Sequence, residues 1–84
     1  MTGDDDIEAA ILALLQARAE SASICPSEVA RALAPDEAGW RALMPAVRRV
    51  AAAMASAQRL RVTARGVDVD ALAARGPIRL ARRG

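Results

Sequence analysis

The chain has 84 residues and a formal charge of +2, a size that suits one small domain with a single hydrophobic core. It contains no histidine, tyrosine or lysine and no glycine-rich phosphate loop, so we expect no enzyme, cofactor or metal site. The lone cysteine, the acidic first residues and the absence of a long apolar run argue against a disulfide, a signal peptide and a membrane span. We therefore expect a cytoplasmic protein.

The charged residues are divided unevenly along the chain. Residues 1–40 hold two arginines against eight acids, a net charge of −6, whereas residues 41–84 hold ten arginines against two acids, a net charge of +8. Clustered arginine focuses positive potential and displaces counterions from a phosphate backbone, so this asymmetry suggests a polyanion-binding face. The plainer alternative is a coding bias towards arginine and alanine. That bias explains the missing lysine but not the position of the arginines.

The first predicted element is a helix over about 5–19. Aspartates at positions 4–6 lie where acids stabilise a helix N-terminus, and apolar residues follow at helical spacing from Ile7 to Leu15. Leu12 lies off this stripe, so it either widens the buried face or marks a contact with a second subunit. On that ground we expect a weak homodimer through this helix.

A second helix is predicted over about 26–34, after a serine-rich loop with room for one short strand. Pro26 suits the first helical position, and Glu28 stands three residues after Cys25, as in a capping box. A helix N-terminus also stabilises a thiolate. Cys25 is therefore either a small buried residue at the junction or an oxidation sensor.

A third helical region spans about 37–57, with Pro45 inside it. Proline cannot donate a hydrogen bond within a helix, so either a short helix over 37–44 precedes a main helix over 45–57, or one helix is kinked. Trp40, the single aromatic residue, lies on the apolar face and is expected in the core rather than stacked on a base. The opposite face carries Arg41, Arg48, Ala52, Ala55 and Ser56, with Arg49 at its margin.

Beyond the third helix the apolar residues alternate. Residues 59–65 switch between apolar side chains and arginine or threonine, which is the pattern of a half-buried strand. Gly66 supplies a turn, residues 67–70 alternate again, and residues 70–74 can form one helical turn. A last strand is predicted over about 77–82.

Three helices closed by a two-stranded hairpin predict a single domain over residues 1–84, with an α+β, mainly helical, winged-helix fold. The second and third helices form a helix-turn-helix, and the hairpin is the wing. The small hairpin cannot stand alone, so its apolar side chains are expected to pack against the helices.

Several segments also carry a family resemblance. They are Ile24-Cys25-Pro26-Ser27-Glu28-Val29-Ala30-Arg31-Ala32-Leu33, Trp40 with Met44-Pro45, Val47-Arg48, Val62-Thr63 and Gly76-Pro77-Ile78-Arg79-Leu80. Together they resemble the bacterial domain of unknown function 3253 family, over about Ile7 to Leu80. The resemblance implies a winged-helix-like fold and supplies no established activity, substrate or partner.

The candidate site is a basic surface on the third helix and the wing. In this hypothesis the helix enters a major groove of DNA, where arginine reads guanine edges and clamps phosphates, and the wing grips the backbone. The helix face is otherwise mostly alanine, so binding should be electrostatic and weakly sequence-specific. The predicted nucleic-acid-binding residues are Arg41, Arg48, Arg49, Arg59, Arg61, Arg65, Arg75 and Arg79.

Structural roles are the alternative for some of these arginines. One alternative is pairing across the hairpin, of Arg61 and Arg65 with Asp68 and Asp70. Another is that Arg79 donates hydrogen bonds to loop carbonyls. The leading functional hypothesis is a DNA-binding protein of the transcription-regulator or nucleoid-associated type. The second is a protein–protein adaptor whose basic face docks an acidic partner, and the third is a thiol-sensing regulator.

Overall fold

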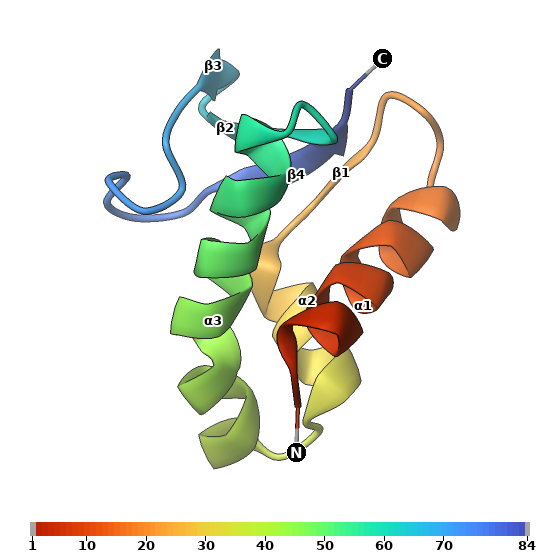
Figure 1. The fold of residues 1–84 in the computed structure, drawn as a ribbon, viewed down its shortest axis with the longest axis vertical. Coiled ribbons are helices and arrows are strands. Elements are labelled where there is room, and N and C mark those ends of the chain that lie inside the picture. The colour runs from red at the N-terminus through yellow and green to blue at the C-terminus, as the bar shows by residue number, and fades with distance from the viewer. Residues whose placement is uncertain (1, 84) are drawn as a thin grey trace.

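The computed structural model describes residues 2–83 and contains three helices and four strands (Figure 1). The helices are α1 (Asp4–Gln16), α2 (Pro26–Leu33) and α3 (Glu37–Ser56). The strands are β1 (Ser23–Ile24), β2 (Leu60–Ala64), β3 (Val67–Asp68) and β4 (Arg79–Arg82). The fold class is α+β, as predicted, and the layout is consistent with a winged helix.

The strands form one antiparallel sheet in the order β1-β4-β2-β3. β4 lies between β1 and β2, so that Leu80 is paired with Ile24 on one side and with Val62 on the other. The predicted two-stranded hairpin is therefore the centre of a larger sheet. β1 and β3 are each two residues long, too short for alternation alone to identify them.

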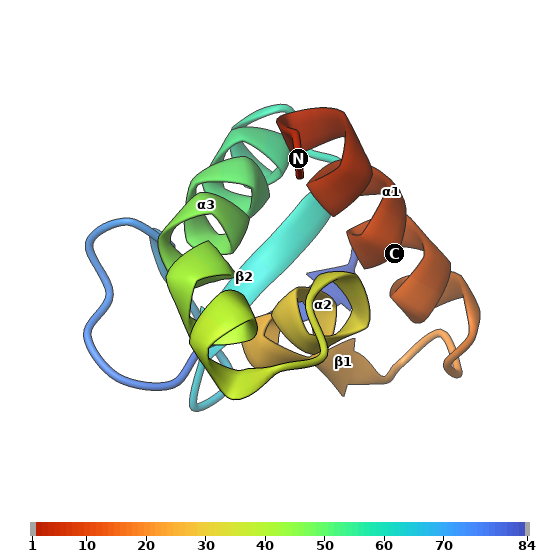
Figure 2. The same ribbon diagram turned by 90° about the horizontal axis from the view of Figure 1, so that it is seen from below.

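The sheet gathers near the C-terminal end of α3, while α1 and α2 lie against the rest of that helix (Figures 1 and 2). α1 contributes Ile7, Ile11 and Leu15 to the core, which is the helical stripe that the spacing predicts. Alternate residues of the strands complete the core, among them Leu60, Val62 and Leu80. The apolar pattern of the sequence therefore predicts the inward faces correctly. No helix within the described residues has the length and hydropathy needed to cross a membrane.

α3 is one helix of 20 residues, even though Pro45 lies inside it. A proline in a helix interior removes one hydrogen bond and destabilises the helix by about 3 kcal/mol. Apolar side chains on both sides of Pro45 pack on the core, among them Leu43 and Val47, and this packing outweighs the loss. Of the two arrangements predicted for this region, the single helix is the one observed.

α3 ends in a Schellman motif whose left-handed position is Gln58, with φ of 60°. The N–H of Arg59 donates to the carbonyl of Met54 at 2.8 Å, and the N–H of Gln58 donates to that of Ala55 at 2.9 Å. Glycine occupies this position in most such motifs because it has no Cβ. The side chain of Gln58 therefore places the backbone under strain here.

We expect Gln58→Gly to raise the free energy of unfolding by about 0.5–1 kcal/mol, because relief of the left-handed strain exceeds the added flexibility of the unfolded chain. Urea unfolding would measure the change. Ala53→Gly, at an exposed site in the interior of α3, is the control and should lower the stability by about 1 kcal/mol. A Gln58→Gly variant destabilised like this control would contradict the interpretation.

Candidate functional site

The eight arginines predicted to bind nucleic acid are spread over four parts of the surface. Two, Arg41 and Arg48, lie on one side of α3, and Arg48 contacts the loop that follows β3. Two lie in the seam between α1 and α3, and two on the outer face of the sheet. The remaining pair occupies the turn after β2 and the loop before β4. The eight arginines therefore do not form a single basic face.

Arg48 holds the loop of residues 69–76, which runs beside α3 in both views (Figures 1 and 2). Its guanidinium donates hydrogen bonds to the carbonyl oxygens of Ala71 at 3.4 Å, Ala74 at 3.3 Å and Gly76 at 2.8 Å. Ala71 is only 2 % exposed and belongs to the core. The Arg48 guanidinium and the buried methyl group of Ala71 therefore help to fix the loop on the helix.

This loop covers the side of α3 that was expected to enter a DNA groove. A groove of about 610 Å³ separates the two, lined by Ala52 and Ala55 of the helix and by Val69 and Leu72 of the loop. The expectation that Arg48 projects freely from a recognition helix is therefore wrong. Its guanidinium donates hydrogen bonds to a loop that is more than twenty residues away in the chain. The stripe that α3 exposes instead is Ala38, Ala42, Pro45, Arg49, Ala53 and Ser56.

The seam between α1 and α3 joins the acidic half of the chain to the basic half. Arg49 pairs with Asp4 and Arg59 pairs with Glu8, each at 2.6 Å. The hydrogen bond to Glu8 and its negative charge raise the pKa of the Arg59 guanidinium above its usual value. Both arginines are thus partly neutralised within the protein, by acids that the sequence pattern assigns only to the start of a helix.

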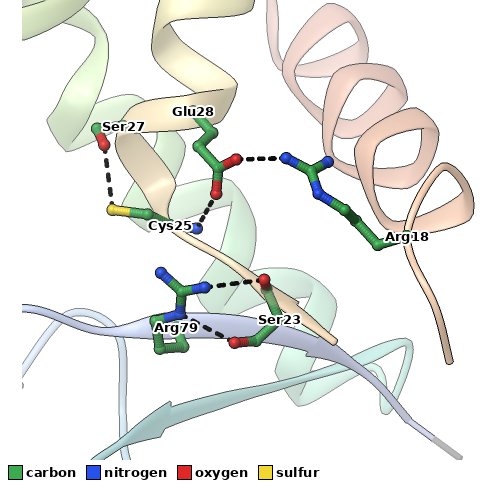
Figure 3. A network of polar contacts seen from close by, with 6 residues as sticks. All are labelled: Arg18, Ser23, Cys25, Ser27, Glu28 and Arg79. Atoms are coloured by element: carbon green, nitrogen blue, oxygen red, sulfur yellow. Dashed lines mark hydrogen bonds and ion pairs between the residues drawn. The ribbon is translucent and has the colours of Figure 1, made fainter. Parts of the chain in front are cut away.

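The outer face of the sheet holds two more of the predicted residues in structural contacts. Arg61 pairs with Asp68 at 2.6 Å, which is the structural alternative considered for it. Arg79 donates to the hydroxyl and to the carbonyl of Ser23, both at 2.9 Å, and thereby ties β4 to β1 (Figure 3). Arg79 is bound to the neighbouring strand rather than to a loop carbonyl. Asp70 accepts from the N–H of Leu72 instead of pairing with an arginine.

Arg65 and Gly66 form the two-residue turn between β2 and β3, with φ of 54° and 80°. Two successive positive φ values define a type I′ turn, which favours asparagine, aspartate and glycine. An arginine there has a left-handed backbone at a cost of about 1 kcal/mol. Arg65 and Arg75 are both exposed, and neither makes an ion pair or side-chain hydrogen bond with another residue in the range 2–83.

The turn from α2 to α3, here called the elbow, carries a cluster that the sequence analysis does not identify. The guanidinium carbon of Arg31 lies 4.5 Å from the ring centroid of Trp40, and that of Arg41 lies 4.9 Å from it. Trp40 packs on the core but is only half-buried, so its assignment to the core is correct only in part. Arg31 escapes prediction because it belongs to the acidic half of the chain.

Cys25 is the N-cap of α2 and is half-buried. Its N–H donates to the carboxylate of Glu28 at 2.8 Å, as the capping pattern predicts, and Glu28 also pairs with Arg18 at 2.6 Å (Figure 3). The thiol sulfur lies 3.1 Å from the hydroxyl oxygen of Ser27. These contacts describe a cap at the loop–helix junction, with no cation beside the sulfur among them.

The sequence matches the model of a known protein family. A protein-family model described as "Protein of unknown function (DUF3253)" matches residues 4–83. No curated protein matches the chain. The match covers all three helices and the whole sheet, so it concerns the complete fold described above.

Proposed function

Because the chain belongs to the DUF3253 family of proteins of unknown function, we propose from its geometry that it binds the phosphate backbone of duplex DNA with little base readout. The contact surface would be the elbow and the wing rather than the exposed stripe of α3. That stripe offers alanine, proline and serine with one arginine, so it supplies few groups for reading base edges.

The observation that carries the proposal is the set of arginines without a carboxylate partner. Within residues 2–83, the arginines that make no ion pair are Arg31, Arg48, Arg65, Arg75, Arg79, Arg82 and Arg83. Three of these hold neighbouring backbone by hydrogen bonds and keep their positive charge. The result is a basic domain whose excess charge lies outside the α1–α3 seam, which favours polyanion binding.

Four exposed arginines are the best candidates for phosphate contact, namely Arg31, Arg41, Arg65 and Arg75. Arg41 and Arg48 are two helical turns apart on the same side of α3, and the loop with Arg75 lies along that side. Arg31 joins Arg41 at the elbow, and Arg65 extends from the turn between β2 and β3. This set keeps Arg41, Arg65 and Arg75 from the predicted residues, although Arg41 lies 3.4 Å from the exposed Glu37. It omits the others, whose guanidiniums make closer contacts, at 2.6–2.9 Å, with acids or strand and loop groups of the protein.

Four phosphate contacts predict a slope of about −3 to −4 for log affinity against log salt. The test is fluorescence anisotropy of a labelled random duplex across a salt series, starting at ~50 mM. Arg65→Gln and Arg75→Gln should each reduce the slope by about 1 and weaken all sequences alike. Arg49→Gln is the control, since Arg49 is paired with Asp4 and should matter little. Binding without salt dependence, or no binding at the lowest salt, would exclude the proposal.

A protein partner is the second candidate, favoured by the groove beside α3. Val67 and Leu72 are each 65 % exposed, and Leu72 lines the groove. Exposed apolar side chains beside a groove are typical of protein contacts. A Leu72→Ser variant separates the two functions. It should leave the affinity for DNA unchanged and lower the affinity for an acidic protein partner.

A further inference from the structure

We propose that Arg31, Trp40 and Arg41 form a phosphate-binding site at the elbow. This inference rests on the proposed function and names one contact site within it. The ligand is a phosphate group, supplied either by a nucleic-acid backbone or by a free polyphosphate. The indole ring fixes the two guanidiniums, and the guanidiniums bind the anion.

Trp40 holds the two cations of the elbow in position. Both guanidinium carbons lie within stacking distance of the same ring, at 4.5 and 4.9 Å from its centroid. The ring itself packs on the core and joins two helices, since Arg31 belongs to α2 and Arg41 to α3. A guanidinium held by stacking loses less conformational entropy when it binds an anion.

The positive charge of the two guanidiniums is poorly compensated by nearby acids. Two like charges near one ring repel each other, and the carboxylate in contact with them is Glu37, 3.4 Å from Arg41. Both members of that pair are largely exposed, with side-chain exposures of 65 % for Arg41 and 71 % for Glu37, so the pair is weak. Arg31 makes no ion pair within the described residues. An anion bound at the elbow would offset this excess of positive charge.

The contacts with Trp40 leave part of each guanidinium available to a ligand. Stacking uses the flat face of a guanidinium and leaves its N–H donors at the edge free for a bidentate contact with phosphate. The same stacking occupies the indole ring, so Trp40 does not offer a free platform for a nucleotide base. One stacked arginine would suffice to brace the elbow, whereas the second adds repulsion and a second set of donors. The cluster therefore fits a phosphate better than a base.

Trp40 is the only aromatic residue of the chain, so intrinsic fluorescence reports on this site alone. We expect binding of a random duplex at ~50 mM salt to change the Trp40 emission. Arg31→Gln and Arg41→Gln should each lower the duplex affinity about tenfold and reduce the salt slope by about 0.9. Arg31→Lys keeps the charge but loses the planar fork, so its affinity should be intermediate. Arg49→Gln is the charge-matched control, and circular dichroism checks that each variant is folded.

The outcomes separate the site from the proposed function. If labelled duplex binds by anisotropy but the Arg31 and Arg41 variants bind like the wild type, the elbow site is overturned while DNA binding stands. If no duplex binds, DNA binding is overturned, and a titration with pyrophosphate decides the elbow site. A Trp40 signal that Arg31→Gln abolishes would then assign the site to free polyphosphate. The lack of any signal would overturn it.

Discussion

An Arg48→Met variant is expected to lose about 2 kcal/mol of unfolding free energy and to release the loop of residues 69–76 from α3. Three carbonyl groups would lose their charged donor, and a hydrogen bond to a charged group contributes about 1.5–3 kcal/mol when the site is protected from water. The estimate is at the low end because one of these contacts is exposed. Methionine retains an apolar stem of similar length, so the loss reports on the guanidinium.

Urea unfolding would give the stability of this variant, and hydrogen exchange would show whether the loop has opened. The matched control is Arg49→Met, the next residue of the same helix. Its ion pair with Asp4 is exposed, with side-chain exposures of 52 % and 65 %, so its loss should be below about 1 kcal/mol. Equal stability of the two variants would return Arg48 to the role of a surface cation available for DNA.

A Leu80→Ala variant is expected to lose about 3–4 kcal/mol. Leu80 has no exposed surface, and it faces Ile24 and Val62 across the two neighbouring strands. Shortening a buried leucine removes apolar contacts and leaves a cavity that the sheet cannot fill without distortion. Small domains have total stabilities of about 5–15 kcal/mol, so the variant would be close to its unfolding transition in physiological conditions.

The control for Leu80→Ala is the same substitution at Leu72, which is 65 % exposed. We expect Leu72→Ala to change the stability by no more than about 0.5 kcal/mol, since little apolar surface leaves the protein interior. The stability losses of the two variants can be compared from their urea unfolding midpoints, measured at one temperature. Similar losses at the two positions would mean that β4 does not lie at the centre of the sheet.

The sequence alone determined the three helical regions, the two longer strands β2 and β4, and their inward faces. Ile7 and Ile11 are one helical turn apart and are both buried, and the alternation of Leu60 and Val62 in β2 places both in the core. Caps are equally local, as the bond from Cys25 to Glu28 shows. These features depend on residues within one or two turns of each other, so their periodicity can be recognised without knowing the fold.

Only the tertiary structure decided which arginines are available for a ligand. The charge asymmetry of the chain is real, but packing α1 on α3 brings Asp4 to Arg49 and Glu8 to Arg59. Packing of the loop on α3 likewise commits Arg48 to backbone carbonyls, and the elbow brings Arg31 to Trp40. Side-chain partners across elements depend on how those elements are placed in space. A local pattern contains no information on that placement, which is why the basic half predicts the presence of excess charge but not its position.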